Sequence, residues 1–335
     1  MRVDTHIGSI EHAATAAREA EAAGYAGAFT GEVSADPFLP LVAAAAVTER
    51  LELGTSIAVA FARSPMTVAY TAHDLQRFSR GRFRLGLGSQ VKAHVTRRFA
   101  MPWGRPAEQM RDYVLALHAV WRSWSTGEPL DFESAHYRHT LMTPMFVPPP
   151  HDFGPPPVFV AGVGPAMTRV AGEVADGFLC HAFSTPRWIR ERTLPALLDG
   201  RRTAGRSLEG FTVRASVFLA TGTDEEIEAA VAKIRPQLAF YASTPAYRPV
   251  LELHGWGELG AELTRLSKAG DWSTMSALIS DDVLSAFAVV APPDEVAAVV
   301  TERYAGSVDR VSFLPHSATN AALDALTSGR MSTWK

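Results

Sequence analysis

Short apolar strands alternate with amphipathic helices over about the first 125 residues, and this alternation constrains the fold more than any other feature of the sequence. It is typical of a parallel sheet whose strands are joined by helical crossovers. Four strand–helix units in that length make half of an eightfold barrel, which usually needs about 250 residues. The predicted strands are Val3–Ile7, Gly27–Thr30, Leu51–Val59 and Arg82–Leu87, and the predicted helices cover residues 9–23, 38–48, 66–78 and 106–124.

Four more predicted strands complete a set of eight. They are Val158–Ala161, Gly177–His181, Phe211–Ala220 and Val308–Leu314, with helices at residues 186–204 and 293–304. Two insertions interrupt the alternation. Residues 126–157 are rich in proline and predict a small hairpin and an irregular excursion, and residues 223–290 are mostly helical. A helix at Asn320–Ser328 would close the barrel. We therefore predict a (β/α)8 TIM barrel of one domain over residues 1–335, with an open doubly wound sheet as the alternative.

The composition excludes several classes of protein. Hydrophobic residues make up 47% of the chain and the net charge is −3, which allows a large core and gives no basic block for binding nucleic acid. Cys180 is the single cysteine, so neither a disulfide framework nor a cysteine-rich metal centre is expected, and the histidines lack metal-ligand spacing. No signal peptide or apolar run long enough to span a bilayer is recognised, so we expect a cytoplasmic protein with no membrane partner.

The segment Val158–Phe178 predicts a buried strand, a glycine turn and a helix. Gly162 and Gly164 give the turn conformational freedom, and Pro165 suits the first position of a helix because its missing N–H is not needed there. The free N–H groups of the helix start would then lie at the carboxyl end of a strand, where they can bind an anion such as phosphate. The alternative is a tight turn that binds no ligand.

Four stretches of the chain together resemble the luciferase-like superfamily of flavin and deazaflavin enzymes, and most closely the branch that uses coenzyme F420. They read AREAEAAGYAGAFTGE, LELGTSIAVAFARSPMTVAYTAHDLQRFSRGRFRLGLGS, VFVAGVGPAMTRVAGEVADGF and PPDEVAAVVTERYAGSVDRVSFLP. The resemblance spans nearly the whole chain and implies a barrel of the bacterial-luciferase type.

The resemblance also implies a cofactor site at the carboxyl ends of the strands. In similar proteins the third strand ends in a bulge with a non-proline cis peptide, against which the cofactor ring rests, and the matching bond here is Ser56–Ile57. The end of the fourth strand, with Gly86, would lie beside the cofactor. The implied cofactor-binding residues are Ser56, Ile57, Gly88, Ser89, Ala161, Gly162, Val163, Gly164 and Pro165.

Catalytic candidates follow from the barrel itself, because functional groups of such barrels lie at the carboxyl ends of the strands. Glu32 would act as an acid or base if burial raises its pKa, and His6 is the second candidate for proton transfer, with packing as its alternative role. Similar F420-dependent sugar-phosphate dehydrogenases carry an Asp-His pair and a further Glu at these ends. Here those positions are Gly31-Glu32-Val33 and Ser89-Gln90-Val91, so neither that substrate nor that mechanism is expected.

The second insertion is expected to shape the substrate pocket, with Arg248 and Trp256 as substrate-facing residues. The resulting prediction is an oxidoreductase that transfers hydride between F420 and an unidentified organic substrate. One alternative is an FMN-dependent luciferase-like monooxygenase, and another is a non-catalytic protein that binds flavin or deazaflavin. Arg97 and Arg98 favour F420 because its tail is acidic. A homodimer is expected because relatives are commonly dimers.

Overall fold

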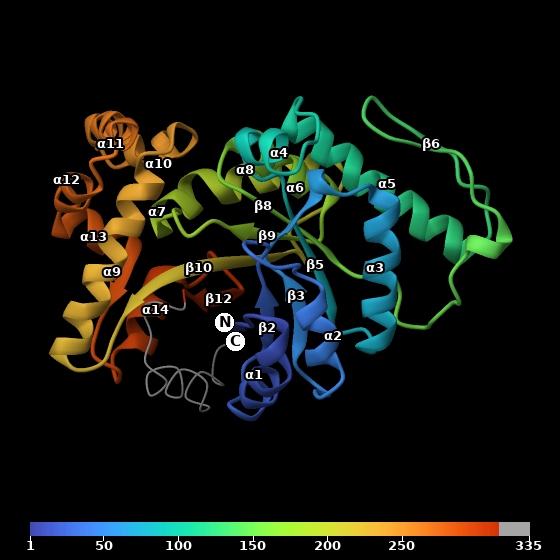
Figure 1. The fold of residues 1–335 in the computed structure, drawn as a ribbon, viewed down its shortest axis with the longest axis horizontal. Helices are drawn as coiled ribbons and strands as arrows, with labels where there is room; N and C mark the ends of the chain where they lie inside the picture. The colour runs from blue at the N-terminus through green and yellow to red at the C-terminus, as the bar shows by residue number, and fades with distance from the viewer. Residues whose placement is uncertain (315–335) are drawn as a thin grey trace.

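A computed structural model describes residues 1–314, and within them eight parallel strands close into a barrel. Neighbouring strands pair around the barrel in the order β1, β2, β3, β5, β8, β9, β10 and β12, and β12 pairs again with β1 (Figure 1). These strands are β1 (Arg2–His6), β2 (Gly27–Thr30), β3 (Glu52–Thr55), β5 (Phe83–Gly88), β8 (Val158–Gly162), β9 (Gly177–Cys180), β10 (Thr212–Ala220) and β12 (Arg310–Phe313). The predicted TIM barrel is confirmed, and the open doubly wound sheet is wrong.

Helices follow the strands and cover the outside of the barrel. Those of the barrel layer are α1 (Ile10–Ala22), α2 (Leu39–Ala45), α3 (Pro65–Phe78), α4 (Lys92–Arg97), α5 (Pro106–Thr126), α6 (Pro165–Val174), α7 (Pro186–Trp188), α8 (Leu194–Thr203) and α14 (Val296–Tyr304). A π-helical turn, Ile189–Thr193, joins α7 to α8, so the helix predicted over residues 186–204 is present with one irregular turn. The helix predicted at Asn320–Ser328 lies outside the described residues.

The two predicted insertions lie on opposite sides of the barrel (Figure 1). The first forms the expected hairpin of β6 (Phe132–Glu133) and β7 (Arg138–His139), followed by the 3-10 turn Pro144–Phe146. The second is helical as predicted and ends in a strand that pairs with β10. Its elements are α9 (Asp224–Ala242), α10 (Arg248–Leu253), α11 (Gly257–Ala269), α12 (Trp272–Ala277), α13 (Asp281–Phe287) and β11 (Ala288–Val290).

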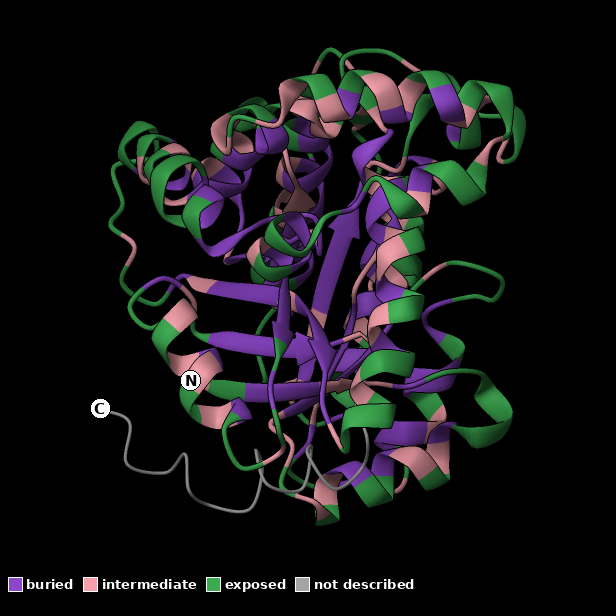
Figure 2. Cartoon of the chain, turned by 90° about the vertical axis from the view of Figure 1, so that its left-hand side faces the viewer, coloured by how far each residue is buried: buried purple, intermediate pink, exposed green. Residues whose placement is uncertain are grey.

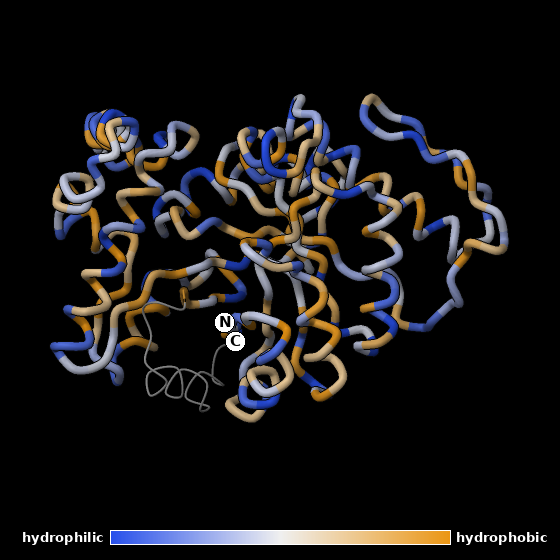
Figure 3. The backbone as a smooth tube through the Cα atoms, in the orientation of Figure 1, coloured by the Kyte–Doolittle hydropathy of each residue, from blue (hydrophilic) through white to orange (hydrophobic). Residues whose placement is uncertain are grey.

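The barrel strands are buried, while the helices alternate between buried and exposed faces (Figure 2) and between apolar and polar residues (Figure 3). In α5 the apolar side chains recur at helical spacing, so Met110, Val114 and Leu117 are fully buried in the main apolar core. A second apolar core lies around Leu238 and Leu263 of the helical insertion and also includes Phe183 and Phe218 from the barrel side. The insertion is therefore packed onto the barrel through a core separate from the main one.

Buried charges occupy the interior of the barrel. Asp4 on β1, Arg214 on β10 and Arg310 on β12 each expose only 1% of their surface. The Asp4 carboxylate accepts hydrogen bonds from Nε of both arginines, each at 2.9 Å, and Arg310 also pairs with Glu52. The Arg214 guanidinium lies 4.2 Å from the ring centre of Phe29. Each buried charge thus has a partner of opposite sign, as burial requires.

Candidate functional site

The third strand ends in the bulge that the resemblance implies. The peptide bond between Ser56 and Ile57 is cis, as predicted, and it separates β3 from the two-residue strand β4 (Ala58–Val59). The Ser56 N–H donates to Thr30 O at 2.6 Å, and Ile57 O accepts from the Glu32 N–H at 3.0 Å. These bonds join the bulge to the end of β2.

The end of β5 lies directly beside this bulge. A Cβ atom placed on Gly88 would lie 2.9 Å from the Ile57 side chain, so only glycine leaves room for that side chain. A Cβ on Gly86 would lie 1.9 Å from Thr55 O, which shows how closely the two strands approach. The Ser89 hydroxyl donates to Gln90 O at 3.1 Å. The structure therefore brings Ser56, Ile57, Gly88 and Ser89 together, and their contact with a cofactor stays a prediction.

The turn after β8 leaves the start of α6 open. Gly164 is the N-cap residue and has no side chain to cap the helix, and a Cβ there would meet no atom within 4 Å. The first N–H of α6 with a partner is that of Thr168, which donates to Gly164 O at 3.1 Å. Among the described residues, nothing accepts a hydrogen bond from the N–H of Ala166 or Met167. An uncapped helix start of this kind can bind an anion.

Two glycines hold α6 close to α8 and so fix the position of this turn. A Cβ on Gly172 would lie 2.2 Å from Leu197 O, and one on Gly200 would lie 2.0 Å from Arg169 O. The backbones of the two helices therefore touch, which larger residues would prevent. Of the predicted set, Ala161 and Gly162 end β8, Val163 and Gly164 form the turn, and Pro165 begins α6. Their cofactor role stays a prediction.

Glu32 lies at the bulge, where its carboxylate already has two donors. Its Oε2 accepts from the Val59 N–H and from Arg63 Nη1, each at 2.7 Å. Burial alone would lower the pKa of Arg63, but the hydrogen bonds and charges of Glu32 and Asp36 raise it. Glu32 thus ties the loop after β2 to β4. The catalytic role of Glu32 stays a prediction.

His6 lies at the carboxyl end of β1, close to Arg214. Burial, and secondly the positive charge of Arg214, lower the pKa of His6 to about 3. The imidazole is therefore neutral at pH 7 and has no imidazolium proton to donate. Its Nε2 is sealed from solvent without a described partner, and so is Nη2 of Arg214. Proton transfer by His6 stays a prediction, and at pH 7 it would have to start from the neutral imidazole.

Arg214 was not among the predicted site residues, although it reaches the bulge. Its Nη1 donates to Ser56 Oγ at 3.1 Å while its Nε is bound to Asp4. The signal in the sequence is a charged residue inside each of two predicted strands, Asp4 in Val3–Ile7 and Arg214 in Phe211–Ala220, with opposite signs. Arg214 therefore connects the buried charges of the barrel to the predicted cofactor site.

The predicted substrate residues lie in the helical insertion. The Trp256 ring stacks on His254, with ring centres 4.8 Å apart, and His254 Nε2 lies 2.8 Å from Thr185 Oγ1. Arg248 begins α10, and its Nε is buried without a described partner. Substrate contact by Arg248 and Trp256 is not tested.

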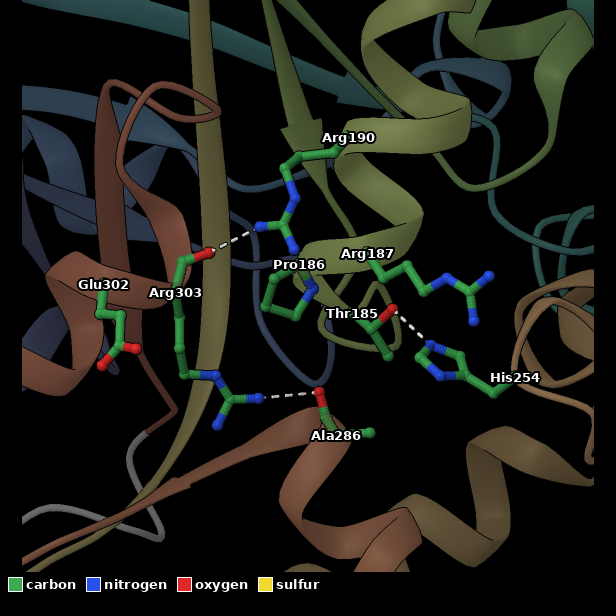
Figure 4. Close-up of a pocket in the computed structure, with 8 residues that line it drawn as sticks. All are labelled: Thr185, Pro186, Arg187, Arg190, His254, Ala286, Glu302 and Arg303. Atoms are coloured by element: carbon green, nitrogen blue, oxygen red, sulfur yellow. Dashed lines mark hydrogen bonds between the residues drawn. The ribbon is translucent and has the colours of Figure 1, made fainter.

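A cavity of about 420 Å³ lies outside the barrel, between α7, α13 and α14 (Figure 4). Arg303 spans one wall and donates to the carbonyl oxygens of Ser285 and Ala286 in the last turn of α13 and of Ala288 directly after it. Arg190 donates to Arg303 O at 3.0 Å. Because these arginines already bind backbone carbonyls, we interpret this cavity as a structural joint between barrel and insertion.

Neither a metal site nor a membrane-spanning helix is found in residues 1–314. No three side chains of His, Cys, Asp or Glu come together there as metal ligands would. None of the helices in this part is both long and apolar enough to cross a bilayer.

Comparison with known proteins decides the family. Residues 2–310 match the luciferase-like monooxygenase family. The chain belongs to this family. It is 51% identical over 327 residues to the uncharacterized protein Rv1360 of Mycobacterium tuberculosis, covering 97% of this chain and 96% of the relative. It is 28% identical over 302 residues to the putative coenzyme F420-dependent oxidoreductase Rv3520c of the same organism, covering 83% of each.

A solved structure supports the same fold. The coenzyme F420-dependent tetrahydromethanopterin reductase of Methanopyrus kandleri superposes with a TM-score of 0.77 at 22% identity, covering 97% of each chain. The barrel is thereby confirmed. The family match and the F420-dependent relative confirm the luciferase-like resemblance and show that the chain is an enzyme. That result argues against the third hypothesis, a non-catalytic binding protein.

Proposed function

We propose that this luciferase-like enzyme catalyses F420-linked oxidoreduction, moving a hydride between coenzyme F420 and an organic substrate. Two observations about relatives support the cofactor. Rv3520c is named a putative F420-dependent oxidoreductase, and the superposed reductase is F420-dependent. Family membership alone does not separate F420 from FMN, so the choice rests on the residues of this chain.

The observation on which this proposal rests is the open start of α6. The unpartnered N–H groups of Ala166 and Met167 lie where a phosphate would complete the helix start, and the space beside Gly164 is free. F420 and FMN both carry a phosphate group, so the residues present fit either cofactor. The bulge at Ser56–Ile57 lies two strands away on the same edge of the barrel, since β8 pairs with β5 and β5 with β4.

The charges on α4 favour F420 over FMN. F420 differs from FMN in its tail of acidic glutamates, which needs cations near the rim of the barrel. Lys92 and Arg97 of α4 and the following Arg98 are exposed, and α4 follows β5, the neighbour of β8. Arg98 Nη2 donates to Val33 O at 2.7 Å, so Arg97 is the freer of the two arginines to pair with a carboxylate.

The protein residues would bind and orient, while F420 when bound would supply the hydride chemistry. The α6 N–H groups would hold the phosphate, and the Ile57 side chain beside Gly88 would support one face of the ring. Arg214 would keep Ser56 in place through its bond to Oγ. Glu32, held by Arg63, would keep the loop after β2 against β4.

The proposal is tested by equilibrium titration of the apoprotein with F420 and with FMN. We expect F420 to bind with a dissociation constant in the micromolar range or below, at least about tenfold tighter than FMN. Gly164→Ala should weaken F420 binding about tenfold, because the added methyl group enters the space beside the helix start. Gly104→Ala is the matched control, since Gly104 also faces open space but lies between α4 and α5.

Arg97→Ala separates the two cofactors. Loss of this charge should weaken F420 binding several-fold and leave FMN binding unchanged, because FMN has no acidic tail. Tighter binding of FMN than of F420 would contradict the proposal and favour a flavin-dependent monooxygenase. If neither cofactor bound, the chain would share only the fold of its F420-dependent relatives and the proposal would fail.

A further inference from the structure

His181 lies at the edge of the barrel where the turn between β8 and α6, made by Val163 and Gly164, begins. We call this the α6 turn. It follows Cys180, the last residue of β9, and Cys180 pairs in register with Gly162 of β8. Two tyrosines of the helical insertion contact its ring. The centre of the Tyr241 ring lies 4.8 Å away at an interplanar angle of 74°, and that of Tyr247 lies 4.8 Å away at 41°. We call these three residues the His181 cluster.

The backbone fixes which nitrogen of His181 carries the proton. The Phe183 N–H donates to Nδ1 of His181 at 3.1 Å, so Nδ1 must hold a lone pair. In the neutral ring the proton is therefore on Nε2. Burial lowers the pKa of His181 to about 4, so the ring is neutral at pH 7. His181 thus presents one N–H donor of fixed identity.

This donor has no partner among the described residues. Within residues 1–314, no hydrogen bond or ion pair joins Nε2 of His181 to another group. This atom is also not among the buried polar atoms without a partner there, which include Nε2 of His6. The contacting rings are those of uncharged tyrosines, and burial, followed by the neighbouring Tyr241, raises the pKa of Tyr247. Val163 of the α6 turn packs against the same apolar core as the two tyrosines. The cluster therefore adjoins the proposed cofactor site.

We propose that His181 is a substrate-binding residue whose Nε2–H donates a hydrogen bond to the carbonyl or hydroxyl oxygen of a neutral, ring-bearing substrate, with Tyr241 and Tyr247 contacting the apolar frame. A neutral donor suits an uncharged oxygen, and aromatic neighbours suit a flat apolar frame. A phosphorylated or carboxylated substrate would instead need a cation in the cluster. The inference rests on the proposed function and names the substrate class.

The test measures ligand binding to protein saturated with oxidised F420, so that no turnover occurs. Three probes share one frame: acetophenone carries a carbonyl oxygen, ethylbenzene lacks it, and 4-acetylbenzoate adds a carboxylate. We expect acetophenone to bind in the millimolar range or tighter, and 4-acetylbenzoate to bind at least about tenfold more weakly. Binding of F420 itself is measured first and separately, so failure of the proposed function is recognised before the substrate probes are used.

Variants of His181 separate hydrogen bonding from packing. His181→Phe keeps a ring but loses the donor, so acetophenone should bind about tenfold more weakly while ethylbenzene and F420 bind as before. His181→Gln keeps an N–H donor and should recover part of the acetophenone affinity. Tyr247→Ala removes part of the frame contact and should weaken both acetophenone and ethylbenzene.

Three results would overturn the inference while F420 still binds. The first is no binding of acetophenone to the wild-type protein. The second is equal binding of acetophenone to the wild type and to His181→Phe. The third is tighter binding of 4-acetylbenzoate than of acetophenone. If His181→Phe does not fold, unchanged acetophenone binding in a folded His181→Ala variant would have the same meaning.

Discussion

The interior of the barrel and the core of the helical insertion after β10 are both buried, but their side chains differ in kind. Inside the barrel, Asp4 binds two arginines that come from strands more than 200 residues away in sequence. In the insertion, the core around Leu238 is apolar and aromatic. A buried charge requires one partner at one distance, whereas an apolar core requires only volume. The charged interior of the barrel therefore depends on specific pairs, whereas the core of the insertion should tolerate other apolar side chains of similar volume.

This difference bears on the site, because the two regions meet there. Arg214 reaches Ser56 from the charged interior, and the His181 cluster is formed partly by the insertion. We infer that the side built by the barrel strands holds the cofactor and that the side built by the insertion selects the substrate. The predictions below test this contrast.

The largest effect is expected when the buried charges lose their partner. Asp4→Ala leaves Arg214 and Arg310 without their shared carboxylate and should lower the free energy of unfolding by about 3–5 kcal/mol. Urea denaturation measures this loss. Glu133→Ala, which breaks the exposed pair with Arg138, is the control and should change stability little. A loss below about 1 kcal/mol in Asp4→Ala would show that the ion network does not hold the barrel.

A smaller effect is expected in the core of the insertion. Leu238 is fully buried, so Leu238→Ala should cost about 2–4 kcal/mol through the cavity it creates. Leu238→Met keeps the volume and should cost less than about 1.5 kcal/mol. By contrast, Asp4→Asn keeps the shape of Asp4 but removes its charge and should be poorly tolerated. Similar losses for Leu238→Met and Asp4→Asn in urea denaturation would remove the contrast between the two regions.

The smallest effect concerns pH. The pKa of His181 is about 4 in the folded protein and near 6.5 when unfolded, so the unfolded chain binds the extra proton between these values. The contribution of His181 to the free energy of unfolding is thus fully present above pH 6.5 and is lost as the pH falls towards 4. At pH 5.5 the loss is about 1.4 kcal/mol. His181→Phe should remove this part of the pH dependence in urea denaturation at pH 7.5 and 5.5. His6, with a pKa of about 3, should make stability fall further at lower pH in the wild type and in His181→Phe alike.

Local patterns in the sequence were enough to predict the barrel. Each of the eight strands lies where its apolar run places it, although the run Leu51–Val59 is divided into β3 and β4 at the bulge. The cap-like start at Thr223 is present. The Thr223 hydroxyl accepts from the Glu226 N–H, and the Glu226 carboxylate accepts from the Thr223 N–H. Such features depend on neighbours in sequence, so they can be predicted from the sequence alone.

The functional site was predicted only in part, because some of its contacts join distant segments. The bond from Arg214 to Asp4 spans 210 positions and depends on the closed order of the strands. The neighbours of His181 depend on how α9 and the turn at Tyr247 fold back against β9, which no local pattern specifies. The expected homodimer and the cytoplasmic location stay predictions.

A crystal structure of the protein with bound F420 tests the account most directly. We predict that the F420 phosphate lies within about 3 Å of the N–H groups of Ala166 and Met167, and that the ring rests on the Ile57 side of the bulge. The carboxylates of the tail should lie near Arg97. A phosphate bound elsewhere would contradict the assignment of the turn before α6 and the division of roles drawn from it. One such place is the cavity outside the barrel, which Arg187 and Arg190 line.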